Sequence, residues 1–130
     1  ITILEKVQRR ATRMMTECKG KEYNERLEIV GLTTLETRRL RADLIEVFKI
    51  IKGYEGLDEG IFFQRKDSIT RGHSLKLYKL RVNKDVFKFS FGHRVIDDWN
   101  KLPEEVVNAT GINSFKTKLD KLLRNKWGCL

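Results

Sequence analysis

The most constraining feature of this chain is the spacing of its apolar residues, which recur every three or four positions over much of its length. The clearest case begins where Thr33 and Glu36 have the spacing of a capping box. The apolar face that follows consists of Leu40, Leu44, Val47, Phe48 and Ile51. An amphipathic helix places such residues on one side, so the pattern predicts a helix from 33 to 53.

The same spacing predicts two helices before this one. The first ends at Gly20, and its apolar stripe, which we expect to face the core, consists of Leu4, Val7, Ala11, Met14, Met15 and Cys18. The second has Tyr23, Leu27 and Val30 on one side, and Gly31 is a natural C-terminal stop for it.

Three further helices, one of them short, are predicted near the C-terminus. One starts at Phe91 and is closed by Pro103, the only proline, which also begins a short helix through Val107. The last starts at the N-cap pair Asn113 and Ser114. It is expected to bury Phe115, Leu119, Leu122 and Leu123.

The middle of the chain is less regular. Residues 53 to 74 form a connector, which the apolar cluster 61–63 is expected to anchor to the core. Apolar and polar residues then alternate from Leu75 and Leu77 to Phe87, Phe89 and Phe91. This alternation predicts either one short β-hairpin near 75–91 or an extended loop that runs into the next helix.

The length of 130 residues fits a single domain, 1–130, and 40% hydrophobic residues are enough for a core. We therefore expect a mainly α, compact helical domain of about five helices. No apolar run approaches the roughly 18 residues that span a membrane, and no signal peptide is visible, so we expect an intracellular protein of the nucleus or cytoplasm with no membrane association. The first residue is Ile1 rather than Met, which suggests a piece of a longer chain. Cys18 and Cys129 are expected to be free thiols.

Positive charge is segregated along the chain. The sequence has 27 Lys and Arg and 18 Asp and Glu, a net charge of +9. Residues 1–20 carry +3, residues 65–101 carry +6 and residues 116–126 carry +4, whereas the remaining segments are acidic. This pattern favours an anionic partner such as RNA or DNA. We expect the three basic segments to form one electropositive surface after folding.

The candidate phosphate contacts come from the first two basic segments. They are Lys6, Arg9, Arg10, Arg13, Arg71, His73, Lys76, Lys79, Arg81 and Arg94. The first four cations could equally form an ordinary solvent-exposed helix face. The denser segment 65–101 is therefore the stronger indication of nucleic-acid binding. The neighbouring aromatics could stack on unpaired bases, but alternate aromatics are more often part of a core.

Catalytic chemistry is not indicated. His73 and His93 have no metal-ligand spacing, and structural or surface roles suit them better. Asp97 and Asp98 could in principle hold magnesium, but helical spacing directs adjacent carboxylates about 100° apart. We expect no cofactor, no metal and no enzymatic activity from this chain.

Seven motifs follow one another along nearly the whole chain. They are 4–12 (LEKVQRRAT), 23–27 (YNERL), 31–36 (GLTTLE), 38–46 (RRLRADLIE), 70–75 (TRGHSL), 94–107 (RVIDDWNKLPEEVV) and 113–116 (NSFK). In this order they resemble the C-terminal end of the polymerase polyprotein of LINE-class (non-LTR, jockey-like) retrotransposons. The chain departs from that pattern at 91–93 (FGH) and 110–111 (TG), which affects the expected helix boundaries.

The resemblance implies a thumb or post-thumb segment of a reverse transcriptase. The polymerase and endonuclease motifs of the family would lie upstream, and 95–98 (VIDD) lacks the aromatic residue of the polymerase motif. The segment is then expected to help hold RNA or DNA beside the rest of the reverse transcriptase polyprotein. The alternative hypothesis is a captured or excised fragment that binds an acidic protein or forms a homodimer through a surface around Met14, Met15 and Cys18.

Overall fold

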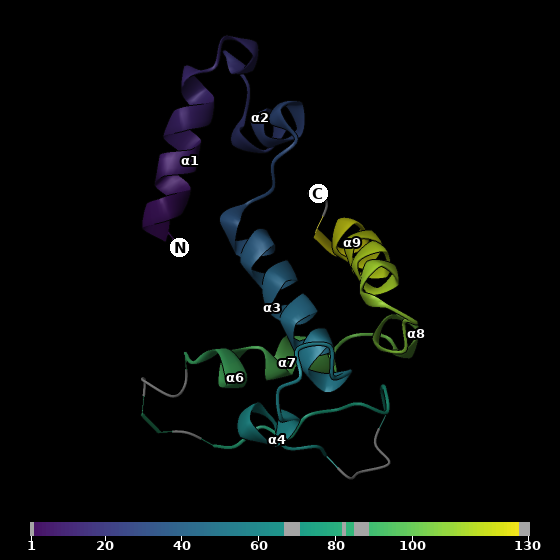
Figure 1. Cartoon of the computed structure of the whole chain (residues 1–130). Helices are drawn as coiled ribbons and strands as arrows, with labels where there is room; N and C mark the ends of the chain where they lie inside the picture. The colour runs from purple at the N-terminus through teal and green to yellow at the C-terminus, as the bar shows by residue number, and fades with distance from the viewer. Residues whose placement is uncertain (1, 67–70, 82, 85–88, 128–130) are drawn as a thin grey trace. The chain divides into compact units, whose positions relative to one another are not determined.

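The chain is described by a computed structural model that covers residues 2–66, 71–81, 83–84 and 89–127 (Figure 1). These residues are mainly helical, which confirms the predicted fold class. The α-helices are α1 (Thr2–Met14), α2 (Tyr23–Val30), α3 (Leu35–Ile51), α4 (Glu59–Phe62), α6 (Phe91–Arg94), α7 (Ile96–Asn100), α8 (Glu104–Val107) and α9 (Ile112–Trp127).

The chain divides into two compact units. Unit 1 consists of Ile1–Arg41 and Asp120–Leu130, and unit 2 consists of Ala42–Leu119. Helices α3 and α9 each contribute one part to each unit. Each unit contains its own buried side chains.

In unit 1, α1 and α2 pack against each other across a turn that contains the short 3-10 helix η1 (Thr16–Cys18). Cys18 and Leu27 are buried here. Gly31 follows α2 with a φ of 70°, and its N–H donates to the carbonyl of Glu28 at 3.1 Å. Glycine adopts this left-handed conformation without a Cβ clash, so the predicted stop at Gly31 is confirmed.

The predicted burial of the apolar stripe of α1 is wrong. Leu4 is 62% exposed, Val7 63% and Met14 77%. Of the predicted stripe only Cys18 is buried, and it lies in η1 beyond the end of α1. The buried residue of α1 itself is Thr12. Apolar spacing therefore identified the helix but not the face through which it packs.

Helix α3 is capped one residue later than predicted. It begins at Leu35, and the Thr34 hydroxyl accepts from the N–H of Thr37 at 3.2 Å. The predicted pair Thr33 and Glu36 is replaced by this cap. A second acceptor comes from α1, where Glu5 accepts from the N–H of Leu35 at 2.9 Å.

Unit 2 is built around stacked aromatic rings. The ring centroids of Phe48 and Phe115 lie 4.2 Å apart, and those of Trp99 and Phe115 lie 6.1 Å apart. All three side chains are fully buried. The indole N–H of Trp99 donates to the carbonyl of Leu75 at 2.8 Å, which satisfies the polar atom of this buried ring.

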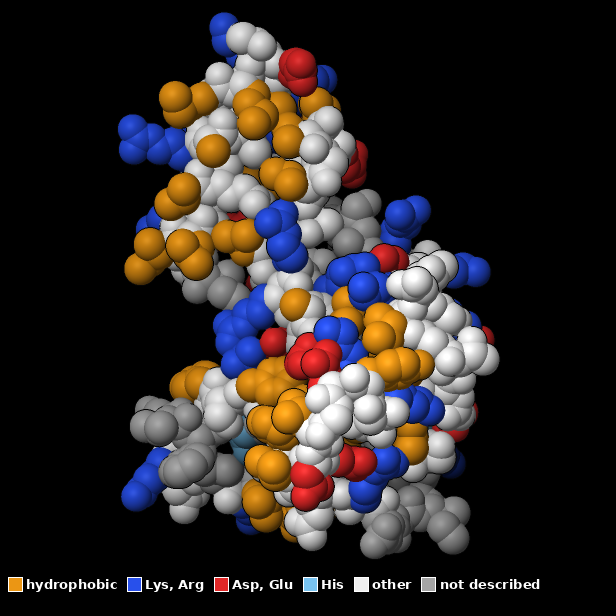
Figure 2. Space-filling view, in the orientation of Figure 1, with side chains coloured by type: hydrophobic (Ala, Val, Ile, Leu, Met, Phe, Trp, Pro, Cys, Tyr) orange, Lys and Arg blue, Asp and Glu red, His pale blue; other side chains and the backbone are white. Residues whose placement is uncertain are grey.

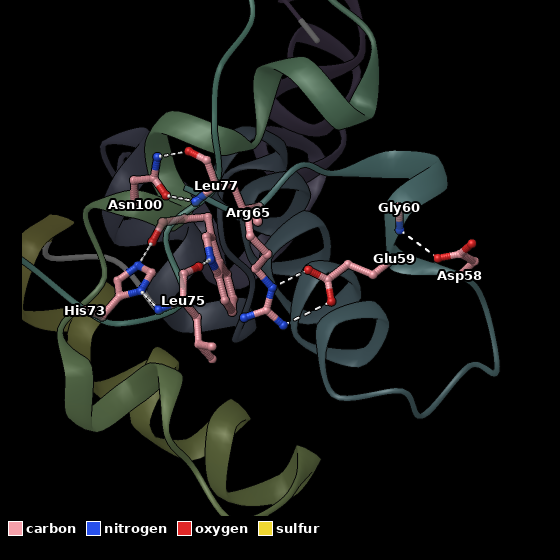
Figure 3. Close-up of polar contacts among 9 residues, drawn as sticks. Asp58, Glu59, Gly60, Arg65, His73, Leu75, Leu77 and Asn100 are labelled. Carbon is pink, nitrogen blue, oxygen red and sulfur yellow. Dashed lines mark hydrogen bonds and ion pairs between the residues drawn. The ribbon is translucent and has the colours of Figure 1, made fainter. Parts of the chain in front are cut away.

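The segment around Leu77 does not pair as the predicted hairpin would require. Leu77 forms an isolated antiparallel bridge with Arg65, and the N–H of Tyr78 donates to the carbonyl of Gln64 at 2.7 Å. The side chain of Asn100 holds both backbone groups of Leu77, at 2.8 and 2.9 Å (Figure 3). Part of the other predicted arm, 85–88, lies outside the described residues.

The predicted helix that starts at Phe91 is divided into α6 and α7 at Val95, whose φ is −80° and ψ is −19°. The short helix after Pro103 is confirmed as α8. The connector contains an unpredicted turn of helix, α4, and of the cluster 61–63 only Phe63 is buried. The connector is thus anchored through one aromatic ring.

Candidate nucleic-acid interface

Helix α1 carries three chemically different faces, because successive residues of a helix are rotated by about 100°. One face packs within unit 1 and is polar: Glu5, Gln8 and Thr12. The second is exposed and apolar: Ile3, Leu4, Val7, Ala11 and Met14. The third, which we call the α1 basic face, is exposed and consists of Lys6, Arg10 and Arg13.

The polar face fixes how α1 lies in unit 1. The Gln8 amide donates to the hydroxyl of Tyr23 and to the carbonyl of Thr33, both at 3.0 Å. Glu5 accepts from the hydroxyl of Tyr23 and from the N–H of Leu35. Burial, together with the Glu5 carboxylate, raises the pKa of Tyr23 above its ordinary value of 10.0. These contacts turn the α1 basic face away from the packed face.

Two arginines stack on Tyr23. The guanidinium carbon of Arg9 lies 4.5 Å from the ring centroid and that of Arg26 lies 5.4 Å from it. Arg26 is 5% exposed and donates to the carbonyl of Arg9 at 3.1 Å, so it links α2 to α1. Sequence analysis missed Arg26, although it follows Tyr23 by three positions and precedes buried Leu27, which places it on the packed face of α2.

The α1 basic face has no ion-pair partner among the described residues. Two carboxylates of unit 1 are engaged with backbone groups instead, because Glu5 accepts from Leu35 and Glu25 accepts from the N–H of Glu22. From Lys6 to Arg13 the three cations span about 10 Å along the helix axis. Their charge is available to an external anion.

In unit 2, two of the candidate cations are paired. Arg94 makes a bidentate pair with Asp43, with Nε to Oδ2 at 3.0 Å and Nη2 to Oδ1 at 2.9 Å. Lys79 pairs with Asp97. Both cations of these pairs already have an anion, so a phosphate would have to displace a carboxylate to bind them.

The remaining candidates of unit 2 lie in the segment that begins at Arg71. Lys76 donates to the carbonyl of Arg71 and lies where a Cβ on Gly72, whose φ is 118°, would be placed. Arg71 and Arg81 are exposed. Arg71 and Arg81 therefore stay as exposed candidates, while Lys76 is folded back onto its own loop.

His73 is 3% exposed and has a structural role in unit 2. Its Nδ1 accepts from the N–H of Leu75 at 3.1 Å, so its Nε2 carries the proton and donates to the carbonyl of Trp99 at 2.9 Å (Figure 3). Burial lowers the pKa of His73 below 6.5. Neither ring nitrogen is left to a phosphate, which corrects the interpretation of His73 as a phosphate contact.

The three basic segments are distributed over both units, so their convergence on one surface stays a prediction. No cluster of three His, Cys, Asp or Glu side chains suited to a metal occurs within the part of the chain that the structure describes. Cys18 is a free, buried thiol, and Cys129 lies outside the described residues. None of the described helices combines the length and the apolar character needed to cross a membrane.

Comparisons of the chain with protein-family models, with curated proteins and with solved structures found no match.

Proposed function

We propose that this chain is a non-catalytic nucleic-acid-binding domain from the C-terminal end of a LINE-class retrotransposon reverse transcriptase, acting in the nucleus or cytoplasm. It holds RNA or DNA by phosphate contacts and works beside the rest of that polyprotein. The observation that carries the proposal is the α1 basic face: three exposed cations on one side of a fixed helix, with no ion pair among the described residues.

The expected binding is electrostatic. Each phosphate that a cation neutralises releases condensed counterions, so the logarithm of the affinity falls with the logarithm of the salt concentration. The slope is about −0.7 per phosphate on single strands and about −0.9 on duplex DNA. Contacts of this kind position a nucleic acid without reading its sequence, so we expect binding that tolerates changes of sequence.

The test is to replace Lys6, Arg10 and Arg13 together by Gln and to measure binding to a labelled single-stranded DNA and a structured RNA by fluorescence anisotropy. On single-stranded DNA we expect at least a tenfold loss of affinity and a salt slope that is shallower by about 2. The matched control replaces three exposed lysines outside α1, Lys52, Lys101 and Lys118, and removes the same charge. Equal losses in both variants would show that net charge, not the α1 basic face, governs binding.

A second candidate function is favoured by the apolar face of α1. Figure 2 shows hydrophobic side chains exposed over α1, and Ile3, Val7 and Met14 are each more than 60% exposed. Isolated exposed apolar residues are ordinary, but a contiguous row marks an interaction surface. We propose as the alternative that this face forms a protein interface, either with a second copy of the chain or with an acidic protein whose carboxylates would meet the α1 basic face.

Light scattering and a nucleic-acid shift assay on the same sample separate these functions. A stable oligomer that does not bind nucleic acid supports a homodimer in place of the first proposal. Replacing Val7 and Met14 by Ser should abolish such association and leave unfolding unchanged, since both side chains are exposed. A monomer that binds nucleic acid as tightly after these substitutions supports the first proposal.

A further inference from the structure

Unit 2 contains a pocket of about 480 Å³ between α4, the segment after Leu77 and the start of α6. Its walls are largely apolar and include Phe62, Tyr78, Leu80, Phe91 and Ile96. Phe62 is 41% exposed and Tyr78 is 47% exposed, so both rings present surface to a ligand. Figure 2 shows hydrophobic side chains at the surface over α4 and α6. The volume lies within the range of about 300 to 1,000 Å³ that is usual for small-ligand sites.

Polar atoms in the wall suit a flat ring that carries hydrogen-bonding groups at its edge. Gln64 lines the pocket, and its side-chain amide has no hydrogen bond to another described residue, so it can offer a donor and an acceptor together. The hydroxyl of Tyr78 likewise has no partner within the described segments. An amide of this type pairs with adenine in a bidentate manner.

The walls of the pocket are held by the fold. The backbone of Tyr78 is bonded to that of Gln64, and the ring of His93 is bonded through Nε2 to the carbonyl of Leu80 at 2.9 Å. Gly92 at the start of α6 lies so close to α4 that a Cβ there would be 3.3 Å from the carbonyl oxygen of Phe62. These contacts hold α4, the segment after Leu77 and the start of α6 in place around the pocket.

Cations lie beside this pocket in the chain. Lys66 is two residues after Gln64, and Arg81 directly follows Leu80. Both are exposed, and neither has an ion pair with another described residue. Aromatic walls, edge hydrogen-bonding groups and neighbouring cations together match a base that is joined to phosphates. A purely apolar side chain of a protein would leave the amide and the cations unused.

We propose that this pocket binds one unpaired nucleobase and so makes the chain select single-stranded or bulged nucleic acid over perfect duplex. This inference rests on the proposed nucleic-acid-binding function and deepens it. The α1 basic face supplies affinity that does not depend on bases, whereas the pocket supplies the discrimination.

The experiment uses two DNA hairpins with equal numbers of phosphates, one with a single bulged adenine and one with an abasic residue in the bulge. Wild-type protein is expected to bind the adenine hairpin roughly tenfold more tightly, the contribution of one stacked base. Phe62→Ala combined with Tyr78→Leu should lower adenine-hairpin affinity to that of the abasic hairpin and leave the abasic affinity unchanged. The matched control is Tyr54→Leu, because Tyr54 is 50% exposed in the same unit and does not line the pocket.

The outcomes separate the two proposals. The Gln variant of the α1 basic face should weaken binding of both hairpins and keep their ratio. Equal wild-type binding of the two hairpins overturns the pocket and leaves the α1 proposal standing. Equal loss in the Tyr54→Leu control also overturns it, because the effect would then not be specific to the pocket. Absence of binding to either hairpin overturns the proposed function and the pocket together.

Discussion

Among the described residues, four cations of unit 2 form ion pairs with carboxylates, whereas one cation of unit 1 does so. Unit 2 has 14 Lys and Arg and 11 Asp and Glu, and the paired cations among its described residues are Lys49, Arg65, Lys79 and Arg94. Unit 1 has 13 and 7, and in its described part Arg41 pairs with Asp120. The pairing of Arg41 raises the pKa of its guanidinium.

This difference shows that charge density along a sequence is a poor measure of available charge. Segment 65–101 has the larger excess of cations, yet Lys79 and Arg94 in it are paired. Segment 1–20 has the smaller excess, and its α1 basic face has no ion pair among the described residues. Segment 1–20 is the stronger candidate interface because the three cations of its α1 basic face lie on one side of a single helix, whereas the exposed cations of 65–101, such as Arg71 and Arg81, lie outside helices.

The largest expected effect comes from breaking the most buried ion pair described in unit 2. The side chains of Asp43 and Arg94 are 16% and 29% exposed, so Asp43→Asn leaves a partly buried guanidinium without its counter-charge. We expect the free energy of unfolding to fall by about 1 to 3 kcal/mol. Urea unfolding followed by circular dichroism measures this loss. The control is Glu36→Gln, an exposed carboxylate of the same helix, which should change stability by less than about 0.5 kcal/mol. Equal losses would show that the pair contributes nothing.

The buried histidine of unit 2 predicts a pH dependence. Because burial holds the pKa of folded His73 below 6.5, the unfolded chain binds more protons as the pH falls below about 6.5. Stability is then fully present above this pH and decreases toward acid, by at most about 1.4 kcal/mol per pH unit.

The measurement is the unfolding free energy of wild type and of His73→Gln between about pH 5 and 8. The wild-type curve should fall more steeply toward acid than that of the variant. Parallel curves for wild type and His73→Gln would contradict a depressed pKa at His73.

An ion pair like those of unit 2 can be introduced into α1 of unit 1. Met14→Glu places a carboxylate four residues after Arg10 on α1, within reach of an ion pair. We expect nucleic-acid affinity to fall about fivefold, which corresponds to roughly 1 kcal/mol. Stability should be unchanged because Met14 is 77% exposed. Met15→Glu adds the same charge beyond the end of α1 and serves as the control. Equal losses would assign the effect to net charge.

Much of the fold could be predicted from the sequence because helix formation depends on residues that are close together in the chain. Apolar spacing and turn residues located α2, α3, α8 and α9 to within a few residues. The buried face of α1 could not be found this way, because α1 packs through hydrogen bonds from Gln8 to Tyr23 and Thr33, and polar residues give no apolar signal.

The cations of the candidate site could be predicted from the sequence, but which of them form ion pairs with carboxylates could not. Arg94 and Asp43 are 51 positions apart, and the pairing of such distant residues depends on the tertiary fold. The same holds for His73, which is buried and bonds to the carbonyl of Trp99, 26 positions away. The α1 basic face could be predicted because Lys6, Arg10 and Arg13 follow one another at intervals of four and three residues, which places them on one side of a helix.

The smallest expected effect comes from releasing a cation of unit 2. The side chains of Lys79 and Asp97 are 37% and 56% exposed, so Asp97→Asn should change stability by less than about 0.5 kcal/mol. The freed lysine should raise affinity for single-stranded DNA about twofold and steepen the salt slope by about 0.7. Asp98→Asn changes the net charge equally at the neighbouring residue, which has no ion pair with a described residue, and it should have the smaller effect. If the two variants bind alike, pairing does not limit Lys79, and the contrast between the units reduces to their net charges.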